Sequence, residues 1–271
     1  MFMKVYVVTD LEGVDCVVLP RQVGLSGTED PMYQKAKHLL TQEVNAAVEG
    51  AFSAGAEQVL VLDGHGANSA YNLVVEELSE KAHYVLGSPW DKYLPQFDRT
   101  IDAVFIVGQH PMAGTRNGVL DHTMSSETWV NAYINNVKVG EIGFIAYYAG
   151  YYGVPVVLVT GDHAACEEAK TLIGAEVEVA PVKFGLSRTS ARCLSPAKAR
   201  SLIREKAEAA LQNPKSVRPL QTSSPVEVRI ELLNTAAAKG FLSRKSSKLI
   251  DERIVVFTGD SIAQVYEFMF G

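Results

Sequence analysis

The stretch Lys4-Val-Tyr-Val-Val-Thr9-Asp10-Leu-Glu12-Gly13 places a short apolar run directly before two acidic residues and a glycine. Similar β-branched runs recur at Val59–Asp63, Ala103–Gly108 and Val156–Thr160. A stretch with helical character separates each run from the next, which is typical of a mostly parallel sheet with crossover helices. The sequence therefore predicts an α/β fold in which helices flank a central, mostly parallel sheet.

Two longer stretches between these runs have helical features. In Tyr33–Ala54 apolar residues recur on one helix face, and Gly55 follows as a suitable left-handed helix end. Ile142–Gly161 is about as long as a membrane span and carries no charge. Gly153 and Pro155 interrupt it, so we predict a helix, a turn and a buried strand instead of a membrane-spanning helix.

The end of the chain has a different pattern. From about Thr189 it alternates helix, strand, helix, strand and helix, and Ser195-Pro196 is suited to begin the first of these helices. We therefore predict a main α/β domain over residues 1–188. A smaller α/β extension covers residues 189–271, either as a separate unit or as part of the same domain.

Composition excludes several classes of partner. The 271 residues carry a formal net charge of −6 and no long block of Lys or Arg, which argues against binding to a nucleic-acid backbone. Cys16, Cys166 and Cys193 are widely spaced, so neither a disulfide framework nor a thiolate zinc site is predicted. The first residues resemble a strand more than a signal peptide. We expect a cytoplasmic protein without a membrane partner.

Residues able to bind a metal follow three of the predicted strands. Asp10 and Glu12 come after the first strand, His65 lies between two glycines after the second, and His110 follows Gly108-Gln109. In open α/β sheets ligands bind at the carboxyl ends of the strands. Imidazole and carboxylate groups are ligands that suit zinc. The sequence therefore predicts a metal site at this edge of the sheet.

Each of these residues also has a purely structural interpretation. Asp10 and Glu12 could be a solvated acid pair, and His65 could cap the loop that follows it. His110 could be a buried histidine with its hydrogen bonds satisfied, and Asp63 could hold its turn through backbone amides. The metal site is favoured because the residues occur together at three strand ends.

The motifs resemble those of one known family in order and spacing. They are Asp-x-Glu-Gly after the first strand, Asp-x-His at the second, Gly-x-His at a later one, and then Gly-Val-x-x-His, Val-Gly-Glu and Ala-Gly-Tyr-Tyr. This pattern is similar to the D-aminopeptidase family. The resemblance runs from Lys4 to about Ala199 and is weaker beyond.

The resemblance implies a set of site residues that spacing alone does not give. It implies two zinc ions per chain, with Asp10 suited to bridge them and His122 near the metals as a catalytic general acid or base. Glu141 also begins an apparent helix, where the helix dipole alone favours a glutamate. The implied zinc ligands are Asp10, Glu12, His65, His110 and Glu141.

The implied activity is that of a metal-dependent aminopeptidase. It would hydrolyse short peptides with an N-terminal D-amino acid, such as D-Ala-D-Ala, through a zinc-activated water. The resemblance also implies a homo-oligomeric, ring-like assembly that admits small peptides. The chain departs from the family after Gly13-Val14, where Asp15-Cys16 replaces the common Ser-Gly. We expect this pair to line the substrate entrance.

Three alternatives stay open at this point. A creatininase-like metal amidohydrolase shares a motif similar to Asp63-Gly-His65-Gly-Ala-Asn68 but has an early Glu-x-His pair that is missing here. A dinuclear phosphoesterase would need a cationic phosphate clamp beside the motifs, and none is present. A non-catalytic metal-binding assembly protein would fold without metal and turn nothing over. The remaining histidines, His38, His83 and His163, are not expected to be ligands.

Overall fold

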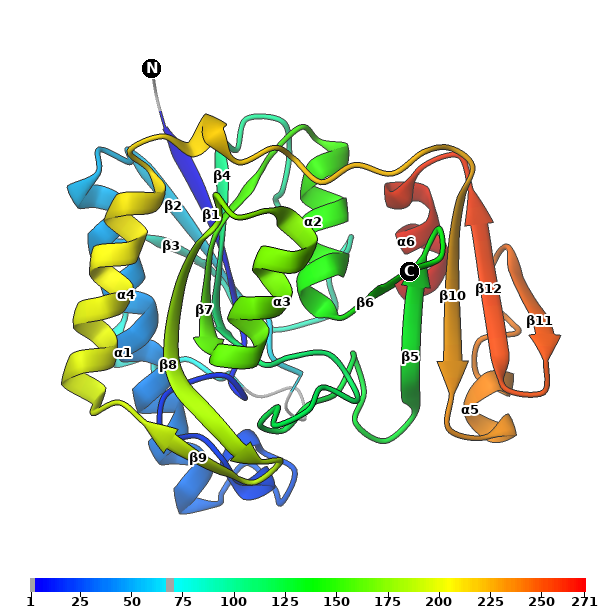
Figure 1. Ribbon diagram of the computed structural model, residues 1–271, viewed down its shortest axis with the longest axis horizontal. Helices are drawn as coiled ribbons and strands as arrows, with labels where there is room; N and C mark the ends of the chain where they lie inside the picture. Colours follow the sequence, from blue (N-terminus) through cyan, green and yellow to red (C-terminus); the bar gives the residue numbers. More distant parts are fainter. Residues whose placement is uncertain (1–2, 67–70) are drawn as a thin grey trace.

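A seven-stranded sheet forms the centre of the protein. The computed structural model describes residues 3–66 and 71–271 (Figure 1). The strand order is β3-β2-β1-β4-β7-β8-β9, and every neighbouring pair is parallel except the last. This confirms the predicted α/β fold with a mostly parallel sheet. The strands are β1 (Lys4–Thr9), β2 (Gln58–Asp63), β3 (His83–Val85), β4 (Ala103–Gln109), β7 (Val156–Asp162), β8 (Glu178–Ser187) and β9 (Ser190–Cys193).

Helices cover both faces of this sheet because successive strand residues point to opposite sides. Val5 and Val7 of β1 pack in one core with α1 (Pro31–Ser53) and α4 (Pro196–Ala210), which lie side by side. Tyr6 and Val8 pack in a second core with α2 (Glu141–Tyr151) and α3 (His163–Ile173). Among the described residues, no helix combines the length and the apolar character that a membrane crossing needs.

A second, antiparallel sheet lies beside the first, as Figure 1 shows. Its order is β11-β12-β10-β5-β6. Tyr266 of α6 donates a hydrogen bond to the carbonyl of Phe144 in α2 at 3.0 Å, so the two helices join the sheets through one core. The elements are β5 (Trp129–Ile134), β6 (Val137–Val139), β10 (Val226–Leu232), α5 (Thr235–Lys239), β11 (Ser247–Asp251), β12 (Ile254–Gly259) and α6 (Ile262–Phe270).

The division of the chain at residues 188/189 stays a prediction, and neither sheet follows it. Strand β9 and helix α4 belong with the parallel sheet, although both come after residue 188. Strands β5 and β6 precede that residue but complete the antiparallel sheet, where β5 pairs with β10. The extension therefore shares its sheet with an insertion from the main part of the chain.

The sheet order places three candidate strand ends next to one another. Strand β1 lies between β2 and β4, with Thr9 level with Asp63 on one side and with Val107 on the other. Parallel strands end at the same edge, so the residues that follow them meet there. Asp10, His65 and His110 are therefore brought together by sheet topology.

Candidate metal centre

The chain leaves β1 along a tightly packed path past β4. The amide of Asp10 donates to the carbonyl of Val107 at 2.8 Å, and the amide of Gly13 donates to the carbonyl of Gly108 at 2.7 Å. Gly108 has a φ of 77°, and a Cβ there would lie 2.2 Å from the carbonyl oxygen of Asp10. Only glycine fits, because it has no side chain and tolerates positive φ. The glycine before His110 thus allows Asp10 to sit where it does.

Asp10, Glu12 and His65 form a first group of ligand atoms, which we call the first lobe. Nδ1 of His65 lies 3.1 Å from Oδ1 of Asp10 and 3.0 Å from Oε2 of Glu12. Its other nitrogen, Nε2, lies 3.0 Å from the carbonyl of Val23. A carbonyl only accepts, so Nε2 carries a proton. Nδ1 is therefore the ring nitrogen that faces the two carboxylates and that a bound cation would use.

His110 and Glu141 form a second lobe, in which one ring nitrogen again faces carboxylates and the other contacts a main-chain carbonyl. Nε2 of His110 lies 3.3 Å from Oε1 of Glu141 and 3.4 Å from Oδ2 of Asp10. Nδ1 of His110 donates to the carbonyl of Pro111 at 2.9 Å, which leaves Nε2 to face the carboxylates. Asp10 therefore faces the first lobe with Oδ1 and the second with Oδ2, as a bridging carboxylate would.

His122 lies at the edge of the second lobe. Its ring stacks on that of His110, with centroids 3.8 Å apart and planes 14° from parallel. Nδ1 donates to the carbonyl of Leu120 at 2.8 Å, and Nε2 faces Oε1 of Glu141 at 3.8 Å. The ligand atoms of His110, His122 and Glu141 all lie within 4.8 Å of one another. The predicted place of His122, near the metals but outside their ligand shell, stays a prediction.

A cavity of about 940 Å³ opens beside the first lobe. His65 and its two flanking glycines line one side, and Met124 lies nearby. Other lining residues are aromatic and include Tyr148, Tyr152, Tyr266 and Phe270 from α2, the turn after it and α6. The antiparallel part of the protein thus contributes, through α6, to the lining of a cavity that His65 also lines.

Comparison with known proteins decides the family. The family model described as D-aminopeptidase matches residues 3–270. The chain belongs to the D-aminopeptidase family. A D-aminopeptidase of Bacillus subtilis (strain 168) is 38% identical over 240 residues, covering 88% of this chain and 84% of the relative. The solved structure of the Zn-dependent D-aminopeptidase DppA from Bacillus subtilis, a self-compartmentalizing protease, superposes with a TM-score of 0.91 at 33% identity, covering 98% of this chain and 95% of that one.

Two buried atoms at the centre indicate that the site fits a cation. Among the described residues, Oε2 of Glu12 and Nε2 of His110 are buried without a hydrogen-bond partner. Nδ1 of His65 lies near Glu12, but one ring nitrogen cannot donate to Glu12 and to Asp10 at the same time. Buried polar atoms are normally satisfied, so atoms left over within a cluster of ligands are consistent with metal binding.

The electrostatics of the centre lead to the same conclusion. Burial alone would raise the pKa of Glu12, but the adjacent His65 holds that pKa well below its usual range. Burial would lower the pKa of His110, yet the carboxylates of Glu141 and Asp10 outweigh it and raise the pKa to about 10. The carboxylates thus need positive charge beside them. A bound divalent cation supplies that charge and leaves the imidazoles neutral as ligands.

Several supporting residues were not predicted from the sequence. Lys183 of β8 is fully buried, and its Nζ donates to the carbonyls of Glu12, Val14 and Val17, so it holds the loop that carries Glu12. Burial lowers the pKa of this lysine. Gln109 donates from Nε2 to Oδ2 of Asp10 at 3.3 Å. The one available signal was a lysine inside an otherwise apolar strand, where a charged residue needs buried partners.

Asp63 has a structural role, as its alternative interpretation from the sequence proposed. Its carboxylate accepts from the amide and the side chain of Asn72 at 2.7 and 2.8 Å. The side chain of Asn72 also donates to the carbonyl of His65 at 2.7 Å, so Asp63 fixes the loop that presents His65. Ala67 and Asn68 of the same motif lie outside the described residues.

The remaining histidines lie away from the cluster, as expected. His38 on α1 pairs with Glu77 at 2.6 Å at the surface, and His83 is exposed at the start of β3. His163 begins α3 directly after Asp162, whose side chain caps that helix. The expectation that Asp15 and Cys16 line the substrate entrance is wrong. Asp15 is fully buried, and neither residue lines the cavity beside His65.

Proposed function

We propose that the chain is a zinc-dependent aminopeptidase that hydrolyses short peptides with an N-terminal D-amino acid. One observation carries the metal-centred part of this proposal. Three imidazoles, those of His65, His110 and His122, each donate one ring proton to a main-chain carbonyl and turn the other nitrogen toward carboxylates. This fixes every ring in the tautomer that a metal or a transferred proton requires.

We propose that zinc occupies both lobes. The first ion would be held by Asp10, Glu12 and His65, and the second by Asp10, His110 and Glu141. The shared carboxylate of Asp10, with one oxygen in each lobe, supports two ions per chain. The zinc dependence stated for DppA, whose fold this chain shares at a TM-score of 0.91, supports the identity of the metal.

The roles of the protein groups follow from this arrangement. When bound, zinc lowers the pKa of coordinated water and polarises a carbonyl. Nε2 of His122 is free of the backbone and lies at the edge of the second lobe, so it can move a proton between water and the leaving amine. The cavity wall beside His65 would hold the peptide and exclude bulk water from the centre.

Substrate and assembly rest on the relatives. The names of the family and of the curated relative support preference for a D-amino acid, with D-Ala-D-Ala as a candidate substrate. DppA is described as self-compartmentalizing, which supports a homo-oligomeric, ring-like assembly here. Three cysteines without a disulfide support a cytoplasmic location. The family match favours this function over the amidohydrolase, phosphoesterase and non-catalytic alternatives.

The test is hydrolysis of matched D-Ala-D-Ala and L-Ala-L-Ala by the zinc-loaded protein, with and without a chelator. We expect cleavage of the D-peptide that the chelator abolishes and zinc restores. His65→Ala should lose activity, whereas His38→Ala, a surface histidine on α1, should keep it. Cleavage of the L-peptide alone would retain the metal chemistry and reject the stereochemistry. No turnover of either peptide would contradict the proposal.

A further inference from the structure

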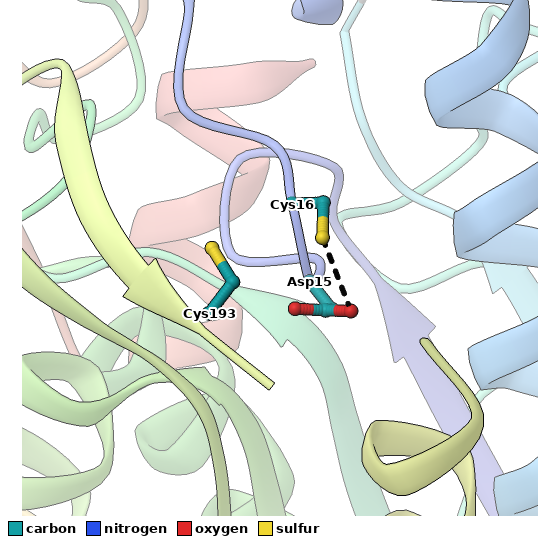
Figure 2. Close-up of side chains that lie close together, drawn as sticks. All are labelled: Asp15, Cys16 and Cys193. Carbon is teal, nitrogen blue, oxygen red and sulfur yellow. Dashed lines mark hydrogen bonds between the residues drawn. The ribbon is translucent and has the colours of Figure 1, made fainter. Parts of the chain in front are cut away.

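A second cluster of side chains that could hold a metal ion lies beside the loop that carries Glu12. Asp15 and Cys16 follow that loop, and Cys193 ends β9 (Figure 2). One ligand atom from each of the three residues lies within 4.8 Å of the others. The two cysteines are far apart in the sequence, which is why their spacing there gave no sign of a thiolate site.

Asp15 contributes an unusual buried carboxylate to this cluster. Asp15 is fully buried, and its Oδ2 accepts a hydrogen bond from Sγ of Cys16 at 3.4 Å. Oδ1 is buried without a hydrogen-bond partner among the described residues. Figure 2 shows one carboxylate oxygen bonded to Cys16 and the other turned toward the side of Cys193. A buried acceptor left without a donor beside two thiols is consistent with a cation site.

The backbone holds the cluster in place from the other side. The amide of Asp15 donates to Oε1 of Glu43 in α1 at 2.8 Å, and Nζ of Lys183 holds the carbonyls of Val14 and Val17. Cys16 has a φ of 60°, a conformation that residues with a side chain rarely adopt. Sγ of Cys16 also lies 3.9 Å from the carbonyl of Leu194, the residue after Cys193. Cys16 is therefore presented by a fixed loop, and Cys193 by the end of β9.

We propose that Asp15, Cys16 and Cys193 bind a thiophilic divalent cation such as zinc, at a site separate from the histidine and carboxylate centre. In tetrahedral sites zinc lies about 2.3 Å from thiolate sulfur and about 2.1 Å from carboxylate oxygen. Ligand atoms within 4.8 Å of one another can reach one such ion with small side-chain rotations. Water or the carbonyl of Leu194 would complete the shell.

The bound cation would act as a clip between two distant segments. Cys16 lies on the loop that carries Glu12, and Cys193 lies on β9 at the edge of the parallel sheet. A metal joining them restrains the loop without touching the substrate, because none of the three residues lines the cavity. This site does not rest on the proposed function, since its ligands and its readout are independent of peptide hydrolysis.

The experiment is a titration of the reduced full-length protein with Co²⁺, followed by absorption spectroscopy. Thiolate ligands give an intense ligand-to-metal charge-transfer band, whereas the active centre offers only nitrogen and oxygen ligands. We expect a band that saturates at one equivalent of thiolate-bound cobalt and disappears in Cys193→Ser. Cys166→Ser should keep the band, because Cys166 is buried on α3 away from the cluster.

A further variant separates lost ligation from lost folding. Cys16→Gly should fold at least as well as the wild type, because glycine suits the positive φ at this position. It should nevertheless lose the charge-transfer band, while its free energy of unfolding without added metal stays at or above that of the wild type. No band in wild-type protein with all three thiols reduced would overturn the proposal, and so would an unchanged band in Cys193→Ser.

Discussion

Replacing Lys183 by methionine tests how the loop that carries Glu12 is held. Methionine has nearly the length of lysine and no charge, so Lys183→Met removes the donor and leaves the packing of β8 nearly intact. The carbonyls of Glu12, Val14 and Val17 would then lose the hydrogen bonds that Nζ of Lys183 donates to them. The backbone pairing of β8 should be kept, because the substitution changes only a side chain within that strand.

The expected loss of stability follows from that count of partners. A buried acceptor without a donor costs about 1–3 kcal/mol, so three of them cost about 3–9 kcal/mol. Burial of the lysine ammonium group itself costs several kcal/mol, and the variant lacks this desolvation penalty, which offsets part of the loss. We expect a net loss of about 3–5 kcal/mol in the free energy of unfolding, the usual size when one partner of a buried charged network is removed.

Urea unfolding of the two proteins side by side measures this loss, and zinc analysis of the purified proteins shows its effect on the site. Zinc affinity should fall by roughly 10–100-fold, as it does when groups that support metal ligands are removed. Lys206→Met is the matched control. Lys206 pairs with Glu178 at 2.9 Å but is about one-third exposed, so its loss should cost less than about 1 kcal/mol. The reasoning would be refuted if the free energies of unfolding of Lys183→Met and Lys206→Met differed by less than about 1 kcal/mol and Lys183→Met had a normal zinc content.

Three further predictions concern the centre and its surroundings. His122→Ala should lower kcat by roughly 10²–10⁴-fold with the zinc content unchanged, and loss of one zinc ion per chain would show instead that His122 is a ligand. Gly108→Ala should lower the free energy of unfolding in urea by at least about 2 kcal/mol and weaken zinc binding, because its Cβ would lie 2.2 Å from the carbonyl oxygen of Asp10. A variant as stable as the wild type would show that the loop moves freely. Burial raises the pKa of Glu43 from 4.5 to about 8, so folding takes up a proton between these values. The free energy of unfolding should therefore fall as pH rises from about 4.5 to about 8, by up to about 1.4 kcal/mol per pH unit. Glu43→Gln should flatten this dependence. An equally steep profile in the variant would assign the dependence to other groups.

The parallel sheet was predictable because its signals are local. Val5–Thr9 and Val156–Thr160 are short apolar runs with a turn or a polar residue at the end, and the structure places both in the central sheet. The same local reading located Asp10, His65 and His110, because residues that follow parallel strands meet at one edge. The fold class and the meeting of these candidates therefore followed from the sequence.

The parts that were not predicted depend on contacts between distant residues. Strands β5 and β10 pair across the predicted boundary, and no pattern within either strand specifies its partner. The apolar stretch around Lys183 indicates a buried lysine, but it does not specify the carbonyl partners, which lie far away in the sequence. Asp15-Cys16 was expected at the substrate entrance, but the loop turns it toward α1 and β9 instead. Glu141 and His122 entered through the family resemblance and not through spacing.

Anomalous diffraction at the zinc absorption edge, from crystals of the zinc-loaded protein, tests the central claim most directly. Apart from any peak beside Cys16 and Cys193, we expect two peaks at the carboxyl edge of the parallel sheet, one beside Glu12 and His65 and one beside His110 and Glu141, with the carboxylate of Asp10 between them. A single peak that does not contact Asp10, or no peak among these side chains, would contradict the account.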